Sequence, residues 1–354
     1  MTRPVHVVMP AGVRDPTRPS GGNAYDVRVC AGLAHRGRPV REHEVRGAWP
    51  RPDPADLARL VAVVRSVPDG DLLLVDGLVG STAPEVVQGA AERLSVAVLV
   101  HMPLGHGPSA PEVAERERRV LVAADVVVVT SEWTRDWLVD AYGLDPRRVR
   151  VATPGADLAP LSSLSTAGGR LLTVGPVSRA KGHDTLAAAL GQLEDLDWRF
   201  VGAGSLTIDP DIAADVERWA VGRRARLTGS LVGPHLDAAY ASTDLLVHPS
   251  RAETYGMVVS EALARGIPVV ATDVGGTREA LGTTERFGRP GLLVAPDDAG
   301  ALAAALRRWL TDDALRRHLR GAAVARREEL PTWDATVSVI DDALSSASLA
   351  GAMS

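Results

Sequence analysis

The chain contains almost no cysteine and no long apolar run, and these two absences exclude several classes of protein. Its single cysteine, Cys30, rules out an intrachain disulfide framework and a cysteine-based zinc site. No segment reaches the ~20 apolar residues that a membrane-spanning helix needs. The first apolar run, Val5–Met9, is too short for a signal peptide. We therefore expect a cytoplasmic protein without a transmembrane segment.

An excess of basic charge is also missing. The 354 residues carry 39 basic and 44 acidic side chains, for a net charge of −5. Nothing in this balance favours a nucleic acid as partner, whereas a peripheral contact with a membrane surface stays open. At ~150 residues per domain, the length favours two domains over one.

Lysine is almost absent, which draws attention to the position where it occurs. Lys181 is the only lysine among 39 basic side chains, and the others are all arginines. The two residue types exchange easily on a solvated surface, but not where a compact ammonium must fit against an anion. Lys181 is therefore a candidate functional residue, and the alternative is that one lysine remained there by chance.

Short apolar runs recur along the whole chain, and amphipathic stretches such as 55–67, 112–123 and 302–310 lie between them. Most of these runs are continuous, which is typical of parallel strands buried on both faces. The rhythm predicts an α/β protein with open, doubly wound parallel sheets. The expected strands are Val5–Met9, Leu72–Val75, Val96–Val100, Val126–Val129, Leu171–Val174, Arg199–Gly202, Leu245–Val247, Val269–Ala271 and Leu292–Val294.

One uncharged stretch rich in serine and glycine, P-L-S-S-L-S-T-A-G-G at 160–169, interrupts the rhythm. We predict an N-terminal domain over 1–160, a linker over 161–169 and a C-terminal domain over 170–330. The amphipathic end, 331–354, is expected to form a helix that packs back on the N-terminal domain. Because ligands bind at the carboxyl ends of such strands, two facing sheet edges would form a deep cleft.

The first candidate loop contains Gly21, Gly22 and Asn23 and lies between the first strand and a helix. Glycines let the backbone approach a ligand closely, and free amides at a helix start attract phosphate. The alternative is a plain turn with Asn23 as the helix cap.

The second candidate loop, S-R-A-K-G-H at 178–183, follows the strand Leu171–Val174 and opens a helix. Arg179, Lys181 and the helix N-terminus converge there, which suits a diphosphate. The spacing of a Walker loop is absent, and the alternative is an exposed basic turn.

The third candidate segment, 250–263, has two glutamates eight positions apart, Glu253 in a turn and Glu261 in the following helix. A carboxylate accepts from two sugar hydroxyls at once, so this pair could hold a ribose and a hexose. The alternatives are a capping box formed by Ser250 and Glu253, and a solvated Glu261.

Two further patterns imitate functional motifs. Asp209-Pro210-Asp211 has the form of a D-x-D metal motif, but Asp209 is better placed as an N-cap with Pro210 in the first turn. Gly202-Ala203-Gly204 is only half of a dinucleotide fingerprint. We therefore assign no metal site and no cofactor.

Taken together, these motifs resemble the family-4 retaining glycosyltransferases. The segment S-R-A-E-T-Y-G-M-V-V-S-E-A-L at 250–263, followed by G-I-P-V-V-A-T-D-V-G-G, is similar to the family's region of two glutamates separated by seven residues. V-G-P-V-S-R-A-K-G-H-D-T-L at 174–186, A-D-V-V-V-V-T-S-E-W-T-R-D-W-L at 124–138, P-G-A-D at 154–157 and the Gly21-Gly22 loop also resemble it.

The resemblance implies the GT-B fold, in which a cleft separates two Rossmann-like domains. It implies the transfer of a sugar from a nucleotide-diphosphate sugar, with retention and without a required metal. The acceptor stays open between a small molecule, a glycan and a lipid-linked acceptor.

The resemblance also implies roles for single residues in the binding of the donor. Glu261 would hold the ribose, Glu253 the donor sugar and Lys181 the diphosphate. The backbone amides of Gly256 and Met257 would contact the sugar and the distal phosphate. Tyr255, Gly21, Gly22 and Asn23 complete the positions expected to bind the donor.

His101, at the end of the strand Val96–Val100, resembles the histidine that the family places near the anomeric carbon, and its alternative role is to cap a strand end. The sequence departs from the family at Pro176, where many members have arginine. Arg179 is close enough to supply that cation. Lys181, Glu253 and His101 are the predicted catalytic residues.

Other functions stay open on the same motifs. A nucleotide-sugar epimerase or a sugar phosphorylase would share the architecture, and a binding module without turnover would share the donor site.

Overall fold

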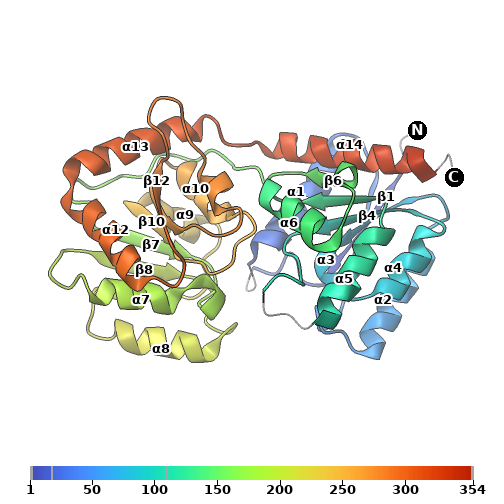
Figure 1. Cartoon of the computed structure of the whole chain (residues 1–354), viewed down its shortest axis with the longest axis horizontal. Helices are drawn as coiled ribbons and strands as arrows, with labels where there is room; N and C mark the ends of the chain where they lie inside the picture. The colour runs from blue at the N-terminus through green and yellow to red at the C-terminus, as the bar shows by residue number, and fades with distance from the viewer. Residues whose placement is uncertain (1–2, 17–18, 108–110, 352–354) are drawn as a thin grey trace. The chain divides into compact units, whose positions relative to one another are not determined.

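The computed structural model describes residues 3–16, 19–107 and 111–351 (Figure 1). These residues form two compact units. The first contains the N-terminal strand, Pro19–Gly155 and the C-terminal helix, and the second contains Ala156–Leu330.

The sheet of the first unit has six parallel strands in the order β2-β1-β3-β4-β5-β6. From β1 the chain first moves outward to β2 and then returns to β3 on the other side. The winding therefore reverses between β1 and β3, where ligands of such sheets bind. The strands are β1 (Val5–Pro10), β2 (Val40–Val45), β3 (Leu72–Asp76), β4 (Ser95–Val100), β5 (Val126–Val129) and β6 (Val149–Val151).

Helices cover both faces of this sheet (Figure 1). Leu33 of α1 and Ile340 of α14 pack on one face, and Leu60 of α2 and Leu121 of α5 pack on the other. Burial on both faces explains why the central strands β3, β4 and β5 are almost continuously apolar. The helices are α1 (Gly21–His35), α2 (Pro54–Ser66), α3 (Gly77–Gly80), α4 (Pro84–Ala91), α5 (Pro111–Ala123), α6 (Glu132–Tyr142), the 3₁₀ turn η1 (Pro146–Arg148) and α14 (Trp333–Gly351).

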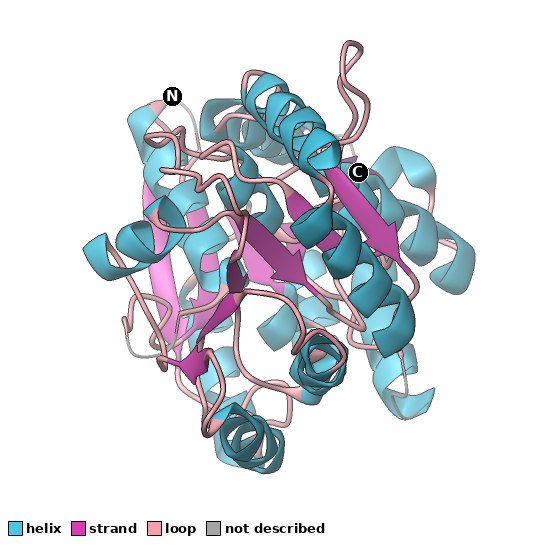
Figure 2. Cartoon of the chain, turned by 90° about the vertical axis from the view of Figure 1, so that its left-hand side faces the viewer, coloured by secondary structure: helices cyan, strands magenta, loops and turns pink. Residues whose placement is uncertain are grey.

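The sheet of the second unit has the order β12-β11-β10-β7-β8-β9 and is also parallel throughout. Its winding reverses between β7 and β10. Figure 2 shows helices on both sides of the strands. The strands are β7 (Arg170–Val174), β8 (Arg199–Ala203), β9 (Ala225–Leu227), β10 (Leu245–His248), β11 (Val269–Thr272) and β12 (Gly291–Val294).

The core of the second unit is likewise divided by its sheet. Leu186 of α7 and Leu306 of α12 pack on one face, and Val259 of α10 and Leu281 of α11 pack on the other. No helix within the described ranges combines the length and apolar character needed to span a bilayer. The helices are the 3₁₀ turn η2 (Arg179–Lys181), α7 (His183–Gly191), α8 (Pro210–Ala220), α9 (Pro234–Ala241), α10 (Met257–Leu263), α11 (Thr277–Leu281), α12 (Ala299–Thr311) and α13 (Asp313–Arg327).

The prediction of two doubly wound parallel sheets is confirmed, and each of the nine predicted runs lies within a strand. The sequence did not reveal β2, β6 and β9. All three lie at sheet edges, where residues such as those of V-R-E-H-E-V in β2 are largely exposed and the apolar signal is lost.

The stretch 161–169 differs from the linker that its composition suggests. Ser162 Oγ donates to the carbonyl of Thr243 at 2.6 Å, and Ser165 Oγ donates to Asp244 Oδ2 at 2.6 Å. These hydrogen bonds tie the stretch to the second unit, so the unit boundary falls earlier, between Gly155 and Ala156. The serines serve as hydrogen-bond donors to the end of the α9–β10 connection rather than as flexible spacers.

Helix α14 packs closely against α1 within the first unit. A Cβ atom at Gly32 of α1 would lie 2.4 Å from Val337 Cγ2 of α14, so only glycine permits this approach. The contact lets the last segment of the chain complete one face of the N-terminal sheet.

We predict that Gly32→Ala lowers the free energy of unfolding, although alanine in a helix normally gains ~0.5–1 kcal/mol over glycine. Overpacking against Val337 should instead cost about 1–3 kcal/mol. Chemical denaturation measures the change. Gly89→Ala in α4 is the matched control, because a Cβ there meets nothing within 4 Å, and it should be neutral or stabilising. Additive losses in Gly32→Ala/Val337→Ala would contradict the proposed contact, since removing both groups should relieve the clash.

Candidate active site

Two predicted residues from different loops meet at the carboxyl edge of the second sheet, where its winding reverses. Lys181 follows β7 and Glu253 follows β10. Lys181 Nζ donates to Glu253 Oε2 at 2.7 Å, with side chains 23% and 11% exposed. The lone lysine and the first glutamate therefore form one partly buried ion pair.

Glycines bring these two loops together. Gly182 has φ +66°, and a Cβ there would lie 2.0 Å from the carbonyl oxygen of Pro249, so the Lys181 loop passes directly over the loop after β10. The Lys181 side chain passes close to the backbone of Gly175, because a Cβ there would lie 3.9 Å from Lys181 Cγ. The backbone therefore places the ammonium above the end of β7.

His248, the last residue of β10, contacts the same carboxylate. Its Nε2 lies 3.1 Å from Glu253 Oε2 and 3.3 Å from Ser250 Oγ, and its side chain is only 3% exposed. Burial by itself would raise the pKa of Glu253. The ammonium of Lys181 and the hydrogen bond with His248 outweigh burial and hold this pKa well below its usual range. Glu253 is thus ionised and presented as an acceptor.

The local structure excludes the capping alternative for Glu253. Helix α10 begins at Met257 with Gly256 as its N-cap, several residues after Ser250. Gly256 has φ +93°, which favours glycine, and it has no side chain to offer to the first amides of the helix. The amide groups of Met257 and the following residue therefore start the helix without a side-chain cap, on the same loop as Glu253.

Glu261 lies apart from this ion pair but is not a solvated helix residue. Tyr240 OH of α9 donates to Glu261 Oε2 at 2.7 Å. Burial raises the pKa of Glu261, against the lowering effect of this hydrogen bond.

The ring of Tyr255 is buried in the core, 3% exposed, where its hydroxyl meets Ser260 Oγ at 3.3 Å. Tyr255 therefore supports the loop from within.

Arg179 does not extend the cationic cluster, because its side chain is exposed. Its backbone N–H donates to Asp209 Oδ2 at 3.0 Å. Asp209 also caps α8, as the sequence predicted, so the D-x-D pattern is structural. Arg251 secures the lysine loop instead. It donates to the Arg179 carbonyl and, at 2.7 Å and 2.9 Å, to the two oxygens of Asp184.

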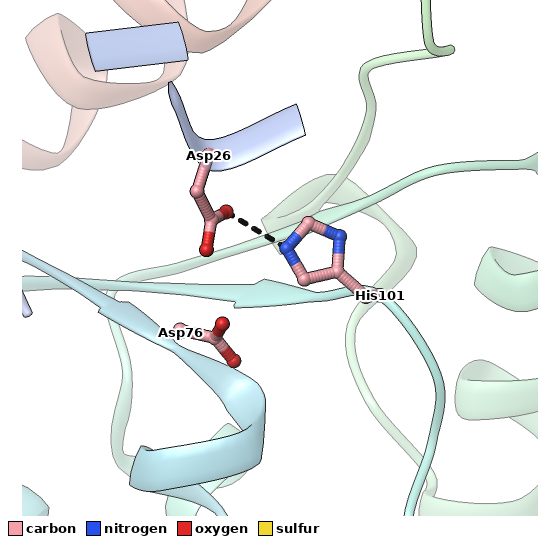
Figure 3. A group of neighbouring side chains, drawn as sticks. All are labelled: Asp26, Asp76 and His101. Atoms are coloured by element: carbon pink, nitrogen blue, oxygen red, sulfur yellow. Dashed lines mark hydrogen bonds and ion pairs between the residues drawn. The ribbon is translucent and has the colours of Figure 1, made fainter. Parts of the chain in front are cut away.

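The first unit places His101 next to two carboxylates, also near the point where its winding reverses (Figure 3). His101 Nε2 lies 2.8 Å from Asp26 Oδ1 of α1, and Asp76 ends the neighbouring strand β3. Figure 3 shows Asp26 and Asp76 on the same side of the imidazole. His101 therefore takes part in a side-chain cluster and does not serve as a strand cap.

The glycines of the first loop make room for this histidine. A Cβ at Gly22 would lie 3.2 Å from His101 Cδ2. Gly21 opens helix α1, and Ser20, not Asn23, is its N-cap, since Ser20 Oγ accepts from the Asn23 amide at 3.0 Å. The half-buried Asn23 is thus a first-turn residue beside the same helix end.

Comparison with known proteins decides the family. The description "Glycosyltransferase Family 4" fits residues 19–160, and "Glycosyl transferases group 1" fits residues 168–312. The chain belongs to glycosyltransferase family 4. A D-inositol 3-phosphate glycosyltransferase of Kineococcus radiotolerans is 35% identical over 263 residues, which cover 64% of this chain and 59% of that protein. The chain thus spans about three fifths of this relative's length.

Solved structures share the family's fold. Sucrose-phosphate synthase of Thermosynechococcus elongatus superposes with a TM-score of 0.78 at 23% identity, over 96% of this chain and 98% of that one. Anabaena HepE in complex with UDP-glucose gives 0.73 at 19% identity, over 97% and 100% of the two chains. The expected GT-B fold is confirmed.

Sequence reasoning missed three residues of the two clusters in this family member: His248, Asp26 and Asp76. A signal existed for His248 and Asp76, because each is a polar residue that ends an apolar strand, as His101 follows one. Asp26 left no such signal, since it lies inside helix α1 and not at the end of a strand. Among the described residues, Asp26, Asp76 and His101 also form the one group whose potential ligand atoms, within 4.8 Å of one another, could hold a metal ion.

We predict that Glu253→Gln destabilises the protein by about 1–3 kcal/mol at pH 7, because Lys181 and His248 lose a charged partner. Since the folded pKa is depressed, the stabilisation is present above the unfolded pKa of about 4.3 and is lost as the pH falls below it. The difference from wild type should shrink in denaturation curves recorded below pH ~4.

Glu194→Gln is the control, because Glu194 forms an exposed ion pair with Arg223 and is itself 61% exposed. Its effect on stability should be small at every pH. A pH-independent loss in Glu253→Gln would show that packing, and not charge, explains its role.

Proposed function

We propose that the chain is a retaining glycosyltransferase that moves a sugar from a nucleotide-diphosphate sugar to an acceptor without a metal. The observation that carries this proposal is the ion pair of Lys181 and Glu253 where the second sheet reverses its winding. This position is where doubly wound sheets bind nucleotides.

The geometry suits a donor whose two ends differ in chemistry. The diphosphate needs a cation, and Lys181 presents an ammonium with 23% of its side chain exposed. The sugar hydroxyls need an acceptor, and the low pKa of Glu253 keeps its carboxylate charged. When a donor binds, the phosphate would share the ammonium while sugar hydroxyls donate to Glu253.

The reaction breaks the bond between the anomeric carbon and the leaving phosphate oxygen. Negative charge grows on the diphosphate, and Lys181 would stabilise it electrostatically. The acceptor hydroxyl forms the new bond on the same face and transfers its proton to the departing phosphate. Glu261 and Tyr240 would then hold the ribose, since their hydrogen bond leaves the second carboxylate oxygen for a hydroxyl.

The choice of first substrates follows from the relatives. HepE was solved with UDP-glucose, and the curated relatives are named for D-inositol 3-phosphate. UDP-sugars are therefore the first donors to test, and D-inositol 3-phosphate is the first acceptor.

A thermal-shift screen of nucleoside diphosphates tests the donor site, because a ligand at 100 Kd adds ~2.7 kcal/mol of stability. NMR of the product then compares its anomeric configuration with that of the donor, and inversion would reject the retaining assignment. Activity should survive excess EDTA. Free nucleotide or phosphorylated sugar that forms without an acceptor would indicate an epimerase or a phosphorylase. Tight binding of the donor without turnover would indicate a binding module.

We predict that Lys181→Arg impairs catalysis nearly as much as Lys181→Ala. The lysine stem lies against Gly175 and its ammonium fits 2.7 Å from Glu253, which leaves little room for a longer, planar guanidinium. Steady-state kinetics should show kcat/KM reduced by at least ~100-fold, about 2.7 kcal/mol of transition-state stabilisation.

Arg223→Lys provides the control for the same exchange, because Arg223 forms an exposed surface pair with Glu194. It should leave kcat/KM unchanged. Wild-type kinetics in Lys181→Arg would mean that this position needs only charge and not the shape of a lysine. Wild-type kinetics in Lys181→Ala as well would overturn the assignment of the phosphate site to Lys181.

A further inference from the structure

The cluster around His101 contains two carboxylates to which the proposed reaction assigns no task. Asp26 and Asp76 are 2% and 6% exposed, and they belong to α1 and to the end of β3. His101, in contrast, keeps 19% of its side chain exposed. A ligand can therefore reach the imidazole, whereas the aspartates act only through it.

The imidazole is held at one nitrogen. Asp26 Oδ1 lies 2.8 Å from Nε2, and within the part of the chain that the structure describes no residue forms a hydrogen bond with Nδ1. Figure 3 shows Nδ1 on the side of the ring turned away from Asp26. The backbone of Gly22 lies beside the ring, since a Cβ added there would lie 3.2 Å from Cδ2. The perpendicular ring of Tyr25, with centroids 5.2 Å apart, further confines the plane of the imidazole.

We propose that Asp26 and Asp76 are positioning residues for His101, which they hold as a hydrogen-bond donor that offers Nδ1–H to a hydroxyl of the bound substrate. This inference rests on the proposed function, because it gives a role to the histidine that the family resemblance places beside the transferred sugar.

The charge of the ring decides between a donor and a base. A neutral imidazole that donates Nε2–H to Asp26 would leave Nδ1 as an acceptor, whereas an imidazolium donates from both nitrogens. Burial alone would lower the pKa of His101, but the charges of Asp26 and Asp76 raise it to about 9. The histidine is thus charged at neutral pH, which disfavours a role as general base.

Asp76 is the second carboxylate of the cluster, and its own pKa is shifted by its neighbours. Burial and the charge of Asp26 raise the pKa of Asp76 to about 7, while His101 lowers it. The Leu78 amide donates to its Oδ1 at 2.6 Å and orients the carboxyl group. Among the residues that the structure describes, these two carboxylates and Tyr25, whose pKa burial raises well above the ordinary value, are the titratable groups that face His101.

NMR titration of the histidine Cε1–H resonances tests the inference without any turnover, and the spectrum of His101→Ala identifies the signal. The pKa of His101 should fall by roughly one unit or more in Asp26→Asn and by a smaller amount in Asp76→Asn. Asp71→Asn is the matched control, because Asp71 pairs with the buried His6 at 3.3 Å near the opposite, amino end of the strands. It should leave the His101 signal unchanged. An unchanged pKa of His101 in both cluster variants would overturn the proposal.

Release of UDP from UDP-glucose in the presence of D-inositol 3-phosphate supplies the kinetic readout. Asp26→Asn should lower kcat by about tenfold or more with a smaller change in KM, and should add nothing in a His101→Ala background, since Asp26 acts through the ring. In wild type, kcat/KM should hold up to about pH 9, whereas Asp26→Asn should lose activity at lower pH. Additive effects, or activity that rises between pH 6 and 8 as for a general base, would contradict the inference.

Two measurements separate this inference from other failures. If UDP does not bind and no nucleotide sugar turns over, the proposed function fails, while the NMR titration still decides whether the aspartates hold His101. One equivalent of metal that is bound by the purified protein and lost in Asp26→Asn would overturn the inference, because the metal would then occupy Nε2. Should Asp26→Asn not fold, Asp76→Asn carries the same titration from the other element.

Discussion

The structure depends on one constraint of parallel sheets: all strands point their carboxyl ends to the same edge, and neighbouring loops diverge where the winding reverses. In the second unit this occurs between β7 and β10, and the loops after these two strands carry Lys181 and Glu253. In the first unit it occurs between β1 and β3, beside the cluster of Asp26, Asp76 and His101. Because neighbouring strands end at the same edge, the residues that follow them lie close together even when they are far apart in the sequence.

Within this constraint, neighbouring charges shift the pKa values of two buried carboxyl groups in opposite directions. Glu253 lies beside an ammonium and a histidine, and its pKa is depressed. Asp76 lies beside another carboxylate, and its pKa is raised to about 7. Both groups pay the desolvation cost of burial, so the difference comes from the sign of the nearest charge. The depressed pKa keeps Glu253 anionic, whereas the charges of Asp26 and Asp76 raise the pKa of His101 to about 9 and favour its cationic form.

Much of the fold could be predicted because the apolar pattern reports burial directly. Eight of the nine detected strands are central and mostly buried on both faces, and their sequences are largely apolar. The ninth, β12, lies at a sheet edge but still has the apolar run L-L-V. The edge strands β2 and β9 are largely solvated, and the three-residue β6 is too short to stand out. The stretch 161–169 misled for a related reason: serine and glycine are typical of linkers, but serine hydroxyls also satisfy buried acceptors such as the Thr243 carbonyl.

The sequence by itself determined the α/β alternation, the family and the positions of Lys181, Glu253 and His101, because each of these is encoded in contiguous residues. The tertiary structure decided which side chains hold them. His248 beneath Glu253 and Asp26 beside His101 come from packing across strands and helices, at separations of 5 and 75 residues. It also decided that Arg179 stays in solvent and that Tyr255 enters the core. The direction of a side chain depends on the elements that surround it, and a linear pattern contains no record of those neighbours.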